Sequence, residues 1–123
     1  PTQLLKMVGY GIDMFDCVLP SRAARHGTAY TSTGKINIRN EKFRLDLEPL
    51  DKEADCFASK EFSRSYLRHL VMAKESLGGG LLTLHNLRFF VKLMEEARVQ
   101  INAGSYSEWA SDWIERYNRG ICQ

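Results

Sequence analysis

The sequence has few cysteines and no long apolar run, and each absence excludes a class of protein. Its three cysteines, Cys17, Cys56 and Cys122, are odd in number and widely separated. A secreted domain held by disulfides normally carries an even, closely spaced set, so we expect a reducing, cytoplasmic location. No apolar run approaches the roughly 18 residues that span a bilayer, so we expect no membrane partner.

The chain also has little net charge, +2 over 123 residues, but its charges are segregated. Against one acid, Glu41, residues 21–44 carry the basic side chains Arg22, Arg25, Lys35, Arg39, Lys42 and Arg44. Residues 45–61 are mostly acidic and contain Asp46, Glu48, Asp51, Glu53, Asp55 and Glu61. A basic segment of this kind can face phosphate groups, and a solvated surface is the plainer alternative.

The first twenty residues predict a helix followed by a buried strand. Leu4, Leu5 and Val8 share one helical face, and Gly9 marks its end. The run "GIDMFDCVLP", residues 11–20, is almost continuously apolar, which is typical of a strand buried on both faces of a parallel sheet. No later segment supplies parallel neighbours for it. We therefore expect the C-terminal part of a larger α/β domain.

The middle of the chain predicts a β-hairpin. Residues 29–32 and 35–38 alternate between apolar and polar side chains on either side of Thr33-Gly34. A pair of residues containing glycine between two short alternating runs favours a tight hairpin turn.

The last half of the sequence predicts helices. Helical spacing begins at Glu61 and is expected to end in the glycine run 78–80, then resumes and stops at Gly104. The final helix carries an aromatic stripe, which we interpret as core packing rather than as a platform for stacked bases: Trp109, Trp113 and Tyr117.

Two aspartates interrupt the apolar run at 11–20. Strand alternation places Asp13 and Asp16 on opposite faces. Asp16 lies near the C-terminal end of the expected strand, where α/β barrels place their catalytic groups. A structural aspartate that caps a turn or pairs with an arginine is the alternative for Asp16, and Asp13 is expected to be structural.

Five motifs in collinear order resemble the C-terminal part of the bacterial-type tRNA-guanine transglycosylases, also called queuine tRNA-ribosyltransferases. They are "GIDMFDCVLPSR", "ARHGTAYTSTGKINIRN", "PLDKEADC", "FSRSYLRHL" and "LLTLHNLRFF". The resemblance implies the end of a TIM (β/α)8 barrel with an inserted zinc-type subdomain, within an α/β class. The fragment itself is expected to be mostly helical with a short β-hairpin.

The resemblance also implies three segments. Residues 1–26 would hold a late barrel helix, a strand and the catalytic loop. Residues 27–85 would hold the hairpin and the zinc-type subdomain, and residues 86–123 the C-terminal helices.

The activity implied by the resemblance is exchange of the wobble guanine of tRNA for a 7-deazaguanine base, preQ1 or queuine, in queuosine modification. The family nucleophile is the aspartate of "MFDCVLP", which is Asp16 here. A carboxylate would attack the ribose and hold a covalent ribosyl intermediate, with a deazaguanine in place of the water of glycoside hydrolysis. Arg22 and Arg25 match the loop that holds the tRNA anticodon region, and their planar forks suit phosphate.

The family resemblance implies a structural zinc held by three cysteines and one histidine. The matching positions are Ala54, Cys56, Ser59 and His85, of which only Cys56 and His85 are zinc ligand types. We therefore expect zinc binding to be weak or lost, with packing by Phe57, Phe62 and Leu84 in its place and Cys56 acting as a small buried residue.

An aromatic face, Phe62, Tyr66 and His69, matches residues that the family uses at its homodimer contact. Packing against the chain's own core is the alternative. The degenerate zinc positions also allow a different class of function, a non-catalytic tRNA-binding or partner subunit derived from the same family. We expect these 123 residues alone to be inactive, because most of the implied barrel lies elsewhere.

Overall fold

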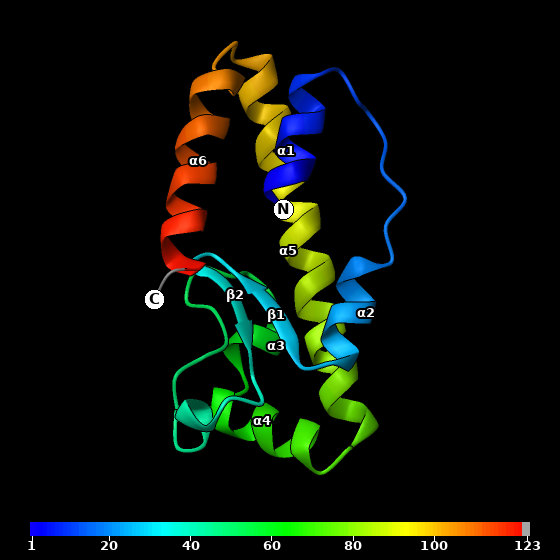
Figure 1. Ribbon diagram of the computed structural model, residues 1–123, viewed down its shortest axis with the longest axis vertical. Helices are drawn as coiled ribbons and strands as arrows, with labels where there is room; N and C mark the ends of the chain where they lie inside the picture. Colours follow the sequence, from blue (N-terminus) through cyan, green and yellow to red (C-terminus); the bar gives the residue numbers. More distant parts are fainter. Residues whose placement is uncertain (122–123) are drawn as a thin grey trace.

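The computed structural model describes residues 1–121, so Cys122 lies outside the described residues. The fold is mostly helical with a two-stranded antiparallel sheet, as the sequence predicts (Figure 1). Its elements are α1 (Thr2–Gly9), α2 (Leu19–Arg25), β1 (Thr28–Thr31), β2 (Gly34–Asn37), η1 (Glu41–Phe43), α3 (Phe57–Lys60), α4 (Arg64–Met72), α5 (Ser76–Asn102) and α6 (Tyr106–Ile121). Within residues 1–121, no helix has the length and apolar character needed to cross a membrane.

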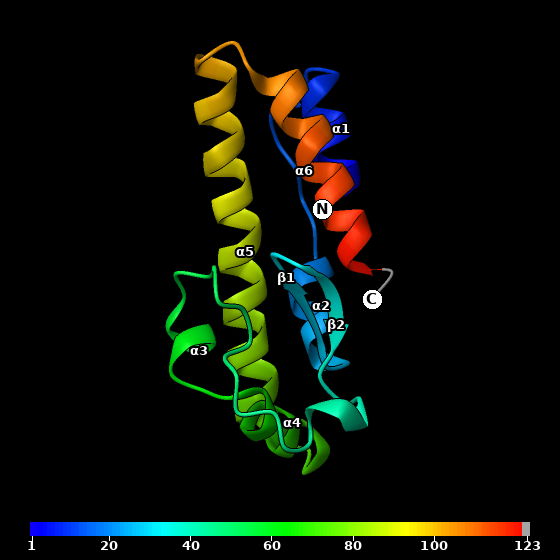
Figure 2. The ribbon, with the colours of Figure 1, turned by 90° about the vertical axis from the view of Figure 1, so that its left-hand side faces the viewer.

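Helix α5 runs along the length of the molecule and organises the other elements (Figures 1 and 2). Helices α1 and α6 lie beside the C-terminal half of α5, and α2, the hairpin, α3 and α4 lie beside its N-terminal half. The helix is continuous through residue 85, where the boundary between the second and third expected segments falls.

The core of residues 1–121 consists of three apolar clusters, each of which includes side chains of α5. The largest lies beside the hairpin and α4 and contains Leu50, Leu67 and Leu82, all fully buried. Burying one leucine side chain stabilises a fold by roughly 1.5–3 kcal/mol. The other two clusters join α5 to α1, β1 and α6 through Leu5, Leu93, Ala97, Tyr30, Phe90 and Tyr117.

The aromatic stripe of α6 belongs to this core, as predicted. Tyr117 is buried, and its ring stacks on Trp113 with centroids 4.8 Å apart. Trp109 and Trp113 are partly buried and pack on the cluster around Leu93. The stripe therefore holds α6 onto α5 and the hairpin.

The hairpin forms, but its turn lies one residue earlier than predicted. Thr31 pairs with Gly34, so Ser32 and Thr33 form the turn instead of Thr33 and Gly34. The buried carboxylate of Asp51 accepts hydrogen bonds from the backbone N–H and the hydroxyl of Ser32, both at 2.7 Å. This long-range contact fixes Ser32 in the turn, and alternation within the strands alone does not reveal it.

The prediction that a helix ends in the glycine run was wrong. Helix α4 already ends at Met72, and Lys74 turns the chain with a φ of 60°. Gly78, Gly79 and Gly80 then lie in the first turns of α5. A Cβ on Gly78 would lie 2.9 Å from the Cβ of Leu70, so the close approach of α4 and α5 requires a glycine there.

The buried strand expected in residues 11–20 does not form among the described residues. Residues 12–18 form no strand, and among the described residues nothing pairs with them. The segment passes along the outside of the molecule between α1 and α2 (Figure 1), and the side chain of Met14 is 86% exposed. A parallel strand needs a neighbour for its backbone hydrogen bonds, and residues 1–121 supply none for this segment.

Candidate functional site

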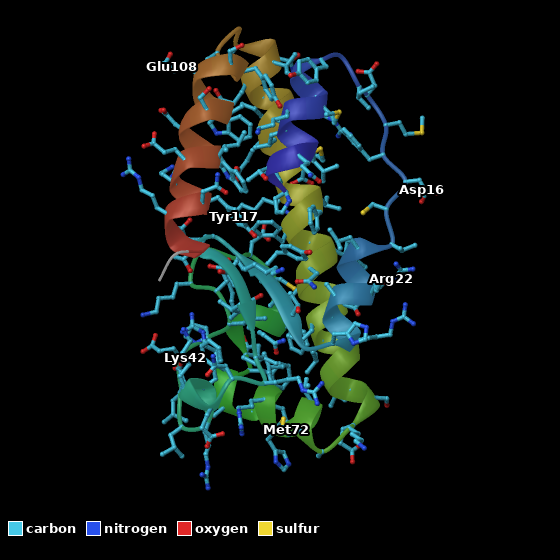
Figure 3. The ribbon with its side chains drawn as sticks, in the orientation of Figure 1. Asp16, Arg22, Lys42, Met72, Glu108 and Tyr117 are labelled. Atoms are coloured by element: carbon cyan, nitrogen blue, oxygen red, sulfur yellow. The ribbon has the colours of Figure 1, made fainter. Side chains whose placement is uncertain are left out.

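Asp16 lies in the exposed segment 12–18 and points away from the body of the molecule. Figure 3 shows Asp16 and Arg22 on the same edge of the protein, on the opposite side of α5 from Glu108. The segment is tied at its start by a hydrogen bond from the Ile12 N–H to the carbonyl of Met7, 3.1 Å. At its end, the Arg22 N–H donates to the carbonyl of Val18 at 3.0 Å and begins α2.

The C-terminal end of this segment is held by Asn86, a residue that the sequence analysis did not single out. Asn86 is fully buried, and its side-chain amide donates to the carbonyl oxygens of Pro20 and Thr28, both at 3.0 Å. Its side-chain oxygen accepts from the N–H of Tyr30, also at 3.0 Å. One side chain therefore holds α2 and β1 on α5. Its place in "LLTLHNLRFF", beside His85, is the signal that could have identified it.

Arg22 and Arg25 occupy different surroundings. Both are exposed on α2, but Arg25 lines a cavity of about 650 Å³ between α2 and the start of α5, together with Arg39 and Lys74. In the part of the chain that the structure describes, none of these three cations forms an ion pair, and Glu75 lines the same cavity. The cavity is accordingly a place where phosphate oxygens could be bound.

The four positions implied as zinc ligands hold a hydrogen-bonded pair instead. Ser59 and His85 are both buried, and the Ser59 Oγ lies 2.5 Å from the His85 Nδ1. The His85 Nε2 lies 2.6 Å from the carbonyl oxygen of Tyr30. Because a carbonyl only accepts, the Nε2 carries the proton and the Ser59 hydroxyl donates to Nδ1. Burial lowers the pKa of His85, against the opposing effects of the Tyr30 carbonyl and Asp51.

The side chains present do not fit a tetrahedral zinc ion. Ala54 has no donor atom and Ser59 offers only a neutral hydroxyl, which leaves Cys56 and His85. Among residues 1–121, no group of three or more His, Cys, Asp or Glu side chains could hold a metal.

Apolar packing around these positions differs from the expectation. Cys56 is buried in the largest cluster, as predicted, and Phe62 packs against that cluster. Phe57 and Leu84 do not fill the site, since they are 58% and 46% exposed. The expected zinc position is instead held by the hydrogen bonds of His85 to Ser59 and Tyr30. These contacts join residues far apart in sequence, so local periodicity does not predict them.

The aromatic face is split between the core and the surface. Phe62 precedes α4 and is partly buried, while Tyr66 and His69 are exposed on the helix. The rings of Phe62 and Tyr66 stack with centroids 5.5 Å apart, and Phe57 meets Phe62 edge-on at 5.4 Å. Intramolecular packing thus accounts for Phe62 and leaves Tyr66 and His69 facing outward.

Comparison with known proteins identifies the protein family of this chain. The model of the family described as Queuine tRNA-ribosyltransferase matches residues 1–119. The chain belongs to this family.

Several curated queuine tRNA-ribosyltransferases are similar to this chain over 98% of its length. Those of Symbiobacterium thermophilum and Moorella thermoacetica are each 48% identical to it, and that of Agrobacterium fabrum is 46% identical. The chain covers 30% of the first of these relatives and 32% of the other two, so it spans about a third of their length.

Proposed function

We propose that this chain is the C-terminal part of a tRNA-guanine transglycosylase, which replaces the wobble guanine of tRNA with a 7-deazaguanine, preQ1 or queuine. The observation that carries the proposal is the family match over residues 1–119, which includes the whole "MFDCVLP" motif. It is supported by the position of Asp16, which lies exposed in a segment tied down at both ends.

In the proposed reaction, a carboxylate oxygen of Asp16 attacks C1′ of the ribose of the target guanosine. The bond between C1′ and the guanine nitrogen breaks, its electron pair leaves with the base, and the base takes up a proton. An ester now joins Asp16 to the ribose. The ring nitrogen of the incoming deazaguanine gives up its proton and attacks C1′, which releases the carboxylate. As in retaining glycosidases, two displacements preserve the configuration at C1′.

Residues 12–18 would complete the catalytic site as a strand of a TIM barrel. Their apolar side chains and their lack of pairing partners among the described residues support this proposal. The relatives are about three times as long as this chain, so other parts of such a polypeptide could supply the neighbouring strands. The nucleophile would then lie at the C-terminal end of its strand, the active-site face of barrels of this kind.

Arg22 and Arg25 are proposed to bind phosphates of the tRNA anticodon loop, with Arg39 and Lys74 extending the contact beside Arg25. The support is the unpaired state of Arg25, Arg39 and Lys74 within the described part of the chain and their shared cavity. The target nucleotide must leave its stack to reach Asp16, as other base-modifying enzymes require.

The decisive experiment measures incorporation of labelled guanine into tRNA by a protein of the relatives' length that carries this chain. We expect Asp16→Asn to abolish exchange and the covalent adduct with tRNA. Asp13→Asn is the matched control in the same segment and is expected to retain exchange. Exchange retained by Asp16→Asn would refute the proposed nucleophile.

A second experiment measures tRNA binding and tests the roles proposed for Arg22 and Arg25. Removing one phosphate contact by Arg22→Ala or Arg25→Ala should weaken binding and lower the salt slope of log K by about one. Arg119→Ala is the control, since Arg119 lies on α6 and pairs with Glu115. An unchanged salt slope in both α2 variants would contradict their assignment to phosphates.

The second candidate is a non-catalytic tRNA-binding or partner subunit of the same family. Ala54 and Ser59 favour it, because they depart from the expected ligand set. Retention of Asp16 favours the enzyme. Tight tRNA binding without any exchange by the longer protein would support the second candidate.

We further propose that the longer protein is a homodimer with Tyr66 and His69 in its contact, which their exposure on α4 permits. Tyr66→Ala should shift the protein toward monomer in analytical ultracentrifugation, whereas an unchanged dimer would contradict this contact.

A further inference from the structure

We infer that α3, α5 and β1 are held together without zinc. A hydrogen-bonded chain that runs from the Ser59 hydroxyl through the His85 imidazole to the carbonyl of Tyr30 links them instead. The inference rests on a disagreement between the ligand set that the family resemblance implies and the side chains at those positions. It uses family membership but not the proposed reaction.

The hydrogen-bonded chain joins α3 to α5, as a metal at these positions would, and it also joins α5 to β1. Ser59 belongs to α3, His85 to α5 and Tyr30 to β1. Their contacts bridge 26 and 55 residues of sequence. A satisfied hydrogen-bonded network is stronger in the low-dielectric interior than in water and rigidifies the fold, and all three residues are at most 5% exposed.

Both nitrogens of the imidazole are satisfied by these contacts. The Nδ1 accepts from Ser59 and the Nε2 donates to Tyr30, so neither is free to bind a metal as the region is folded. Zinc bound by His85 would have to replace one of these hydrogen bonds. It would gain only Cys56 as a second strong ligand, too few for the closed tetrahedral shell of a structural site.

The neighbouring backbone supports the position of Ser59. Its N–H donates to the carbonyl of Cys56 at 3.0 Å, at the first turn of α3. Cys56 is itself buried in the largest cluster. A serine at position 59 therefore presents its hydroxyl to His85 from a short helix that is anchored on the core.

The first test is metal content and its effect on unfolding. We expect protein expressed with added zinc and then dialysed to contain far less than one zinc per chain, and its Tm to be unchanged by EDTA. Stoichiometric zinc, or a Tm lowered by EDTA, would overturn the inference.

The second test removes the hydroxyl. Ser59→Ala leaves the buried Nδ1 without a donor and should lower the Tm by roughly 5 °C. Ser111→Ala is the matched control, because the exposed Ser111 hydroxyl bonds only to the carbonyl of Ser107 in its own helix. An unchanged Tm in Ser59→Ala would overturn the inference.

The third test restores the missing ligands. The double variant Ala54→Cys/Ser59→Cys should bind one zinc per chain and become sensitive to EDTA, because it supplies three cysteines and one histidine at positions 54, 56, 59 and 85. Failure of this variant to take up zinc would contradict the part of the inference that assigns the loss of zinc to Ala54 and Ser59.

Discussion

The side-chain amide of Asn86 lies 3.0 Å from the carbonyl oxygen of Pro20, although 66 residues separate the two in sequence. Pro20 follows the segment that carries Asp16, so this hydrogen bond connects the central helix to the candidate nucleophile loop. The position of the loop thus depends on a residue of the core that has no chemical role in the reaction proposed for Asp16.

Replacing Asn86 with leucine should destabilise the fold strongly. The change leaves the carbonyls of Pro20 and Thr28 and the N–H of Tyr30 without their buried partner. We expect the free energy of unfolding in urea to fall by roughly 2–4 kcal/mol. Asn118→Leu on the exposed face of α6 is the control and should change it by much less. A loss of similar size in both variants would contradict the role given to Asn86.

Gly120 should not tolerate a side chain, because α6 meets the hairpin turn at this point. A Cβ there would overlap the backbone carbonyl oxygen of Thr33. We expect Gly120→Ala to lower the free energy of unfolding by roughly 1–3 kcal/mol.

Gly79→Ala is the control for Gly120→Ala, and it should change the free energy of unfolding in the opposite direction. It lies inside α5 with no atom within 4 Å of its added Cβ, so alanine should stabilise the protein by roughly 0.5–1 kcal/mol. Urea titration of both variants measures the difference, and a stabilising Gly120→Ala would show that α6 does not approach the turn so closely.

Two tyrosines of α6 should respond differently to loss of their hydroxyl. The Tyr106 hydroxyl donates to the carbonyl of Leu5 at 2.5 Å, so Tyr106→Phe should cost roughly 1 kcal/mol in thermal unfolding. The buried Tyr117 hydroxyl has no partner within residues 1–121, and burial raises its pKa. Tyr117→Phe should therefore leave stability unchanged or raise it. A larger loss from Tyr117→Phe than from Tyr106→Phe would be inconsistent with these contacts.

Acid should weaken the ion pair between Asp46 and Arg64, which are 3.1 Å apart. Burial alone would raise the pKa of Asp46, but hydrogen bonds from the Glu48 N–H and Arg64 outweigh it and hold the pKa below its usual value. A carboxyl with a lowered pKa in the folded state contributes stability above its unfolded pKa and loses that contribution as the pH falls through the folded value.

The measurement for Asp46 compares wild type with Asp46→Asn in urea at two pH values. Wild type should be the more stable near pH 6, and its advantage should shrink by about pH 2. An advantage that stays constant over this range would exclude Asp46 as the source of the acid sensitivity.

Local patterns predicted those parts of the fold that depend on neighbouring residues. Helix α1 ends at Gly9, and α5 ends just before Gly104, which has a φ of 73° suited to glycine. The aromatic stripe of α6 predicted its buried face for the same reason, since period and burial are encoded within one helix.

Contacts between distant segments were not predictable in this way. The glycine run suggests a chain break by composition, yet Gly78 serves the packing of α5 against Leu70. The apolar run around Asp16 suggests a strand, yet a strand forms only with a partner. The pairing of Ser59 with His85 depends on tertiary structure in the same way, and only the positions involved could be identified from the sequence.

The continuity of α5 has a consequence for how the protein unfolds. Leu82, Leu93 and Phe90 place this one helix in all three apolar clusters, so no cluster can separate without exposing part of it. We expect a single cooperative transition, and the slowest amide hydrogen exchange in the middle turns of α5, where protection reports global rather than local opening.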